Sequence, residues 1–157
     1  MPRPLQLAVI GAADCDEDAF DAAREVGRLL AEAGCTILTG GLSGVMEAAS
    51  LGASEAGGTV VDILPGADRD AANDWVQTVI ATGCGDARNA MLVNSADGVI
   101  AIGGSWGTLS ELAFALEREL PVIGLGSFEE QLPIERASTP LYAVAWMLDR
   151  LGAALTD

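Results

Sequence analysis

The stretch GVIAIGGSWGTLSEL, residues 98–112, contains the pattern that decides the fold of this 157-residue chain. The apolar run 98–102 is followed directly by the glycine cluster 103–107, and then by residues with the spacing of an amphipathic helix. Short apolar runs without polar alternation are typical of strands that are buried on both faces, as in parallel sheets covered by helices. The stretch therefore predicts one strand–loop–helix unit of an α/β domain.

The same unit recurs along the whole chain. The expected strands are 5–10, 36–39, 59–64, 75–80, 98–102 and 121–125, and the expected helices are 17–33, 45–56, 87–95, 108–119 and 140–151. Residues 66–74 are expected to form an acidic polar loop. We expect residues 1–157 to form a single three-layer Rossmann-like α/β domain, with a mostly parallel sheet flanked by helices.

The charge balance excludes several classes of chemistry. The formal net charge is −15, all eight basic residues are arginine, and histidine is absent. Without lysine or histidine there can be no Ser-His-Asp triad, Schiff base or Walker lysine, and three widely spaced cysteines predict no metal site. So acidic a surface repels phosphate backbones, and we expect no nucleic-acid partner.

The hydropathy of the chain predicts no contact with a membrane. No apolar run approaches the ~20 residues that a membrane-spanning helix needs. The start, Met-Pro-Arg-Pro, does not have the pattern of a signal peptide. We therefore expect a cytoplasmic protein.

Two glycine clusters stand between an expected strand and an expected helix. Glycine lets the backbone approach a ligand closely, and a helix N-terminus offers free N–H groups to an anion. The alternative is that these glycines only turn the chain. On the first interpretation a small phosphorylated ligand is bound by Gly40, Gly41, Ser43, Gly44, Glu47, Gly104, Ser105, Trp106, Gly107 and Thr108. Trp106 would then stack on the ligand as a lid.

Arg88 and Glu111 are the charged candidates for this site. Arg88 stands at the head of an expected helix, where a cation opposes the helix dipole, so it is interpreted either as a phosphate anchor or as an ion-pair partner of Asp86 or another acidic residue. Thr108 and Glu111 have the spacing of a capping box, with Thr108 as the N-cap. A carboxylate at this place is also suited to acid–base catalysis, and both interpretations of Glu111 remain open.

These motifs resemble the LOG, or lysine-decarboxylase-like, Rossmann superfamily. The resemblance covers roughly residues 5–152 and rests on four motifs in order: GGLSGVME at 40–47, GDARN at 85–89, SAD at 95–97 and GGSWGTLSE at 103–111. Within the superfamily the chain is most similar to the branch that includes the molybdenum cofactor carrier proteins. LOG enzymes usually have lysine after the arginine, where this chain has Asn89, and Pro-Gly-Gly-Tyr where this chain has Gly-Gly-Ser-Trp at 103–106.

The resemblance implies two functions. A carrier would bind the phosphate-bearing pterin of the molybdenum cofactor without turnover, with Arg88 paired to the phosphate and no cofactor required. A LOG-type phosphoribohydrolase would cleave the N-glycosidic bond of nucleoside 5′-monophosphates, with Arg88 as substrate anchor and Glu111 as the acid–base carboxylate. The departures at residues 89 and 103–106 favour the carrier.

A third possibility is a structural or regulatory oligomer without ligand. The superfamily also implies a homo-oligomer, a dimer or a tetramer, whatever the function. The small-residue helix 45–56 is expected to form one of its contact surfaces.

Overall fold

The computed structural model describes residues 2–155. Its sheet consists of β1 (Gln6–Gly11), β2 (Thr36–Thr39), β3 (Thr59–Leu64), β4 (Thr78–Ala81), β5 (Gly98–Ile102), β6 (Val122–Leu125) and β7 (Glu135–Arg136). Its helices are α1 (Glu17–Glu32), α2 (Val45–Glu55), α3 (Arg88–Asn94), α4 (Trp106–Glu117) and α5 (Pro140–Arg150), with 3₁₀ turns η1 (Arg69–Ala71) and η2 (Gly85–Ala87).

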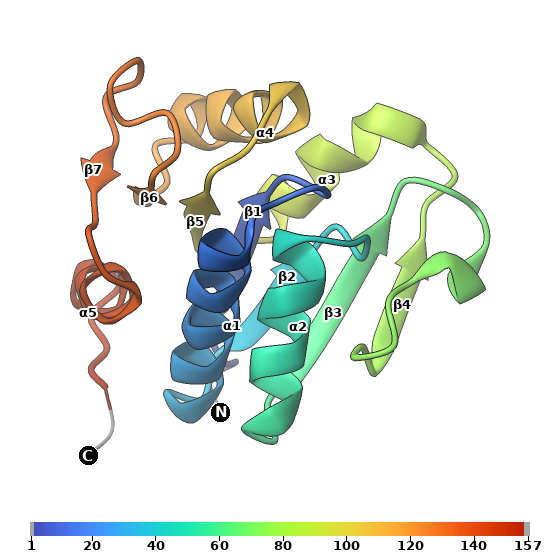
Figure 1. Ribbon diagram of the computed structural model, residues 1–157, viewed down its shortest axis with the longest axis horizontal. Coiled ribbons are helices and arrows are strands. Elements are labelled where there is room, and N and C mark those ends of the chain that lie inside the picture. The colour runs from blue at the N-terminus through green and yellow to red at the C-terminus, as the bar shows by residue number, and fades with distance from the viewer. Residues whose placement is uncertain (1, 156–157) are drawn as a thin grey trace.

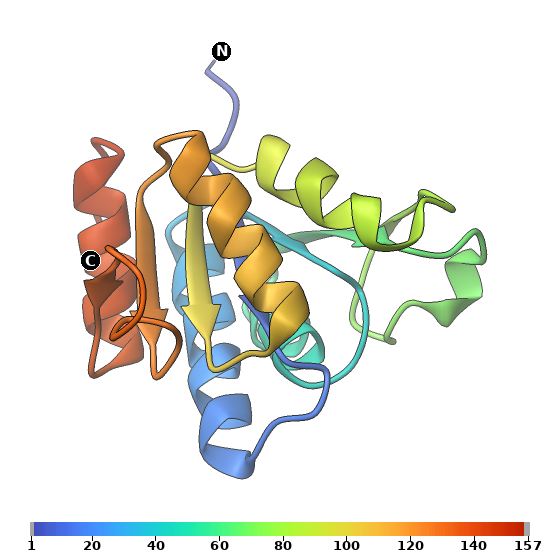
Figure 2. The ribbon, with the colours of Figure 1, turned by 90° about the horizontal axis from the view of Figure 1, so that it is seen from above.

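The strands form one parallel sheet in the order β4-β3-β2-β1-β5-β6-β7. Helices α1, α2 and α5 cover one face and α3 and α4 cover the other, so that β1 and β5 are buried between the two layers (Figure 1, Figure 2). The central strand β5 is buried along its whole length, as its apolar sequence predicts. The predicted three-layer Rossmann-like fold is therefore confirmed.

The packing of α1 against α2 depends on two glycines. A Cβ on Gly27 would lie 2.1 Å from the carbonyl oxygen of Ala49, and one on Gly52 would lie 1.8 Å from that of Arg24. Most of the small residues of α2 therefore pack inside the chain, and the contact of helix 45–56 with another subunit stays a prediction. They serve to bring two helices close together on one face of the sheet.

The fourth strand lies further along the chain than its sequence predicts. The strand expected at 75–80 corresponds to β4, which spans Thr78–Ala81 in the structure. Residues 73–75 form a turn instead, in which the backbone N–H of Trp75 donates to Asn73 Oδ1 at 3.2 Å. The Asn73 amide nitrogen also donates to the carbonyl oxygen of Leu42 at 3.1 Å. Asparagine commonly closes such turns with its own backbone, and this one keeps residues 73–75 out of the sheet. The short edge strand β7 was not predicted.

Within residues 2–155, no helix combines the length and the apolar character that crossing a bilayer requires.

Candidate functional site

The strand order places a switch point beside β1. From β1 the chain moves outward through β2, β3 and β4, and it then returns to the other side of β1 as β5. In open α/β sheets ligands bind at such a point, beyond the carboxyl ends of the strands. A cleft of about 160 Å³ lies there. Its lining residues are Gly11, Ala12, Ala13, Met46, Asp86, Arg88, Asn89, Ser105, Gly107, Thr108 and Glu111.

The structure brings part of the predicted site together in this cleft. Arg88 of α3 and Glu111 of α4 meet there with Ser105 and Gly107 of the second glycine loop, residues 103–107, whereas Gly104 of that loop lines a separate hollow. Ser43 and Glu47 line an adjoining hollow of about 440 Å³, which shares Ala13 with the cleft. Trp106 is 85% exposed and lines neither space.

The first glycine loop, residues 40–44, contributes no residue to the lining of the cleft and lies behind Arg88, which donates to the carbonyl oxygen of Gly40. Gly44 is the N-cap of α2 and has no side chain to occupy the N–H groups of the first helical turn. Ser43 Oγ donates to the carbonyl oxygen of Ala13 at 2.9 Å, and the N–H of Val45 donates to that of Ala12 at 3.1 Å. The loop is thus fixed to the chain that follows β1, and the start of α2 is held at the edge of the cleft.

Arg88 is a buried cation held by neutral groups. It is the first residue of α3, it is 8% exposed, and its Nη1 donates to the carbonyl oxygens of Gly40 at 2.7 Å and Ile63 at 3.0 Å. Its Nε is buried and has no hydrogen-bond partner within residues 2–155. Burial lowers the pKa of Arg88, and the carboxylates of Glu111 and Asp86 act against that shift.

The predicted alternative of an ion pair between Arg88 and Asp86 is wrong. Among the described residues, no carboxylate lies within ion-pairing distance of the guanidinium. The carbonyl oxygens of Gly40 and Ile63, at the ends of β2 and β3, take its donors in place of an acid. Its charge therefore remains unpaired at the wall of the cleft.

Glu111 lies across the same cleft and does not cap its helix. The helix begins at Trp106 with Ser105 as N-cap, and the backbone N–H of Ser105 donates to Thr108 Oγ1 at 3.4 Å. The predicted Thr108–Glu111 capping box is wrong because Gly104, at φ 116°, and the extended Ser105 let the helix start two residues earlier. Thr108 is then the third helical residue, and the Glu111 carboxylate is free for the cleft.

The Glu111 carboxyl is suited to proton transfer near neutral pH. It is 8% exposed, and burial raises its pKa to about 7, although the charge of Arg88 acts in the opposite direction. A carboxyl with such a pKa is present in both its protonated and its ionised form at pH 7. The cleft thus contains one permanent cation and one group that can hold or release a proton.

The sequence analysis did not single out two further polar residues, Thr39 and Asp62. Both are fully buried, Thr39 Oγ1 donates to Asp62 Oδ1 at 2.6 Å, and the N–H of Gly41 donates to Thr39 Oγ1 at 3.0 Å. Burial raises the pKa of Asp62 to about 6. An acidic residue inside the otherwise apolar strand β3 was the available signal, because buried charges are rare without a partner.

The loop after β1, residues 11–13, also lines the cleft and was not predicted. Its three small residues stand at the first strand–helix connection, where a nucleotide-binding fold often places its ligand. A Cβ on Gly11 would lie 2.4 Å from the carbonyl oxygen of Ile102. The signal in the sequence was a glycine directly after the first strand.

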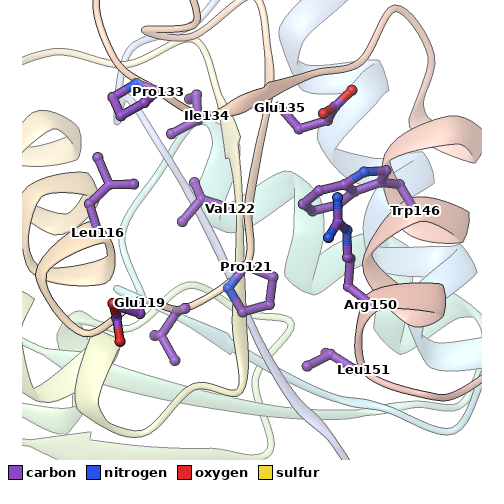
Figure 3. A pocket seen from close by; sticks show the side chains of 11 residues that line it. Leu116, Glu119, Pro121, Val122, Pro133, Ile134, Glu135, Trp146, Arg150 and Leu151 are labelled. Carbon is purple, nitrogen blue, oxygen red and sulfur yellow. The ribbon is translucent and has the colours of Figure 1, made fainter.

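A larger hollow of about 530 Å³ lies at the opposite end of the sheet (Figure 3). It is bounded by the ends of α4 and α5 and by the start of β6, with Leu116, Val122 and Leu151 among its apolar side chains. Its cation, Arg150, stacks on the ring of Trp146 at 4.9 Å. The hollow thus shares no residue with the predicted site, and its arginine already faces an aromatic ring.

Fold and cleft define the chain as an α/β protein of the Rossmann-like class. Within this class, the model of the SLOG cluster4 family matches residues 4–146, and the chain belongs to that family. An uncharacterized protein of Archaeoglobus fulgidus is 47% identical over 121 residues, which are 77% of this chain and 80% of that protein.

Two solved structures are similar over nearly their whole length. The molybdenum cofactor binding protein from the phototrophic bacterium Rippkaea orientalis is 35% identical with a TM-score of 0.91, and the match covers 95% of this chain and 98% of that one. The molybdenum cofactor carrier protein from Chlamydomonas reinhardtii is 33% identical with a TM-score of 0.84, covering 96% and 99%. The predicted resemblance to the carrier branch is confirmed.

Proposed function

We propose that this protein binds a small phosphorylated ligand in the cleft between the two glycine loops, as a carrier of the molybdenum cofactor type. The observation that carries the proposal is Arg88, a buried guanidinium at the cleft wall without an acidic partner. Keeping such a charge out of water is costly unless an anion meets it, and a phosphate is suited to its planar array of donors. The solved structures named for binding or carrying the molybdenum cofactor support this ligand class.

The helix ends around the cleft favour the same ligand. Gly44 and Ser105 are the N-caps of α2 and α4, so neither helix has an acidic N-cap, although α2 carries Glu47 in its first turn. The start of α1 differs, since Asp16 caps it and accepts from the N–H of Ala19 at 2.8 Å. A phosphate would thus meet the positive ends of α2 and α4, while α1 already has a carboxylate in that place.

The decisive comparison is between Arg88→Ala and Glu111→Gln. Arg88→Ala is expected to weaken binding by roughly 30-fold or more, since a charge-assisted hydrogen bond contributes about 1.5–3 kcal/mol. Glu111→Gln is expected to leave the affinity within about threefold, because Glu111 is not a phosphate ligand in this proposal. Calorimetric titration with a panel of nucleoside 5′-monophosphates and a pterin phosphate measures both.

Arg118→Ala is the matched control, because it removes the same charge from the far end of α4, where Arg118 is exposed. Equal, small effects of Arg88→Ala and Arg118→Ala would overturn the assignment of Arg88. Absence of any thermal stabilisation by the whole panel would favour the ligand-free oligomer instead. Light scattering tests the homo-oligomer, and an unambiguous monomer would contradict that part.

A second candidate function is phosphoribohydrolysis, and Glu111 is the observation that favours it. Its carboxyl is buried opposite Arg88, is free of helix capping and has a pKa raised to about 7. Such a group could hold the proton or activate the water needed to cleave an N-glycosidic bond. Chromatographic detection of free base that wild type releases and Glu111→Gln does not would replace the carrier by this enzyme.

A further inference from the structure

One peptide group behind Arg88, outside the lining of the cleft, is held at both ends. Its carbonyl oxygen, that of Gly40, accepts from Arg88 Nη1 at 2.7 Å, and its N–H, that of Gly41, donates to Thr39 Oγ1 at 3.0 Å. The two partners pull on the same peptide plane from opposite sides. Its orientation therefore decides whether Arg88 has an acceptor at this position.

Asp62 determines which way the Thr39 hydroxyl points. A hydroxyl has a single proton, and that of Thr39 is donated to Asp62 Oδ1 at 2.6 Å. An ionised carboxylate can only accept, so Thr39 must turn its lone pairs toward the N–H of Gly41. The N–H of Gly41 thus donates to Thr39, and Thr39 donates to Asp62. This series of hydrogen bonds begins at the Gly40–Gly41 peptide, whose carbonyl oxygen accepts from Arg88.

Without this chain the peptide would have a second orientation available. Gly41 has φ +79°, a conformation that glycine adopts and leaves at little cost. A flipped peptide would turn its N–H toward the guanidinium and remove one of the two acceptors of Nη1. Arg88 would be affected directly, because its guanidinium packs so closely on Gly40 that a Cβ there would lie only 2.1 Å from Nη1.

We propose that Asp62 is a positioning residue for Arg88, which acts through Thr39 and the Gly40–Gly41 peptide to hold the guanidinium in the orientation that meets the phosphate. The assignment of a phosphate to Arg88 rests on the proposed function. The geometric part, in which Asp62 and Thr39 fix the orientation of Arg88, can be measured without any ligand.

The surroundings of Asp62 make it sensitive to the loss of its charge. Its neighbours across β3 are Thr39 and Val79, neither of which titrates, and Arg88 is the charged group that acts on it. Its Oδ2 is buried and has no partner within residues 2–155. Since burial raises its pKa to about 6, the carboxyl is mostly ionised at pH 7.5 and mostly protonated at pH 5. The orientation of Arg88 is therefore expected to change over this range.

The first test compares Thr39→Val with Thr39→Ser, since only serine keeps the hydroxyl. The readout is the ¹⁵N–¹H signal of the Arg88 Nε group at pH 7.5, identified by its absence in Arg88→Lys. We expect a separate signal in wild type and Thr39→Ser and an exchange-broadened one in Thr39→Val. Affinity for inorganic phosphate is expected to fall about tenfold in Thr39→Val and to stay within about twofold in Thr39→Ser.

Asp62→Asn keeps an acceptor oxygen but removes the charge, and it decides the matter if Thr39→Val does not fold. In a Glu111→Gln background, which removes the other buried carboxyl, the Arg88 signal should shift near pH 6, and Asp62→Asn should abolish that shift. An unchanged Arg88 signal in a folded Thr39→Val variant, or a shift near pH 6 that survives Asp62→Asn, would overturn the proposal. If wild type binds no phosphate, the proposed function fails, while the Arg88 signals still decide the role of Asp62.

Discussion

The two glycine loops have the same spacing, Gly-Gly-x-x-Gly, and both connect a buried strand to a helix at the cleft, yet their surroundings differ. In loop 40–44, a Cβ on any of the three glycines would meet an atom within 2.6 Å. In loop 103–107, only a Cβ on Gly104 would be crowded, at 2.5 Å from the Thr108 side chain, whereas one on Gly103 would meet nothing within 4 Å and one on Gly107 only Asn89 Nδ2 at 3.9 Å. The first loop is a fixed wall held by buried side chains, whereas the second is open on its solvent side.

This difference shows that a glycine pattern alone does not tell how a loop is used. Glycine 40 is required because Arg88 lies against its backbone, whereas glycine 104 is required because its φ of 116° starts helix α4 early. Each loop also has a buried carboxyl group close to it, Asp62 for loop 40–44 and Glu111 for loop 103–107. Asp62 has a hydrogen-bond partner in Thr39, and Glu111 faces the cleft. Three predictions test this contrast, beginning with the largest effect.

Alanine at position 40 should be far more harmful than alanine at position 107. The new Cβ of Gly40→Ala would stand 2.1 Å from Arg88 Nη1 and 2.8 Å from Met46 Sδ, and it would displace the buried guanidinium from its acceptors. We expect a loss of about 3 kcal/mol in the free energy of unfolding, since a buried charge loses hydrogen bonds. Denaturant unfolding measures this loss.

Gly107→Ala is the matched control, because residue 107 lies inside α4 with room for a Cβ. Alanine in a helix is favoured over glycine by up to about 1 kcal/mol, so stability is expected to stay equal or to rise. Residue 107 lines the cleft, and phosphate affinity should nevertheless fall severalfold. Comparable destabilisation by the two variants would contradict the contrast between a fixed and an open loop.

The second prediction concerns pH and Glu111. Because burial raises the pKa of Glu111 from 4.5 to about 7, the folded protein holds this proton more tightly than the unfolded chain does. The Glu111 contribution is thus most favourable at low pH and is lost as the pH rises from 4.5 to 7. Glu111→Gln removes this titration and is expected to add on the order of 2 kcal/mol of stability at pH 8, with a much smaller effect at pH 5.

Glu117→Gln serves as the control, since Glu117 is exposed on the same helix. Both variants remove one negative charge, so a difference between them reports burial and not net charge. Chemical denaturation at pH 5 and pH 8 measures it. If the free energy of unfolding changes with pH in the same way in Glu111→Gln and in wild type, burial does not raise the pKa of Glu111.

The smallest expected effect is that of Trp106→Ala. The side chain is 85% exposed, so its removal should change stability by less than about 0.5 kcal/mol. If Trp106 stacks on the ligand as predicted, adenosine 5′-monophosphate should bind about tenfold more weakly, whereas inorganic phosphate should bind unchanged. Trp75→Ala, which alters another exposed tryptophan outside the cleft, controls for general effects. Equal losses of affinity for adenosine 5′-monophosphate and inorganic phosphate would contradict the prediction that Trp106 stacks on the ligand.

The sequence predicted the fold well because the apolar runs of the strands are nearly continuous and the glycines mark their ends. The sequence also indicated Arg88 as a candidate, since a cation at a helix start contradicts the local electrostatics, and its role in binding stays a prediction. The predicted capping box of Thr108 and Glu111 was wrong, because the spacing Thr-x-x-Glu does not tell at which residue the helix begins. The start of the helix depends on the backbone conformation of Gly104 and Ser105, which the sequence alone does not reveal.

Asp62 illustrates a second limit. Its position in a strand was predicted, but its hydrogen bond to Thr39 depends on the register of β2 against β3, in which these two residues are paired. Register is a property of two segments, and residues 39 and 62 are far apart in the chain. The series of hydrogen bonds that links Asp62 to Arg88 through Thr39 and the Gly40–Gly41 peptide could therefore be recognised only in the three-dimensional structure.

The pairing of β1 with β5 has a consequence for the order of folding. It joins Leu7 to Gly98, about 90 residues apart, and the cleft lies beside this pair. Closing so long a segment is slow compared with forming the neighbouring strand–helix units on either side. The cleft should thus come into existence only in the last stage of folding. A ligand that binds there would leave the rate of folding nearly unchanged and would lengthen the lifetime of the native state.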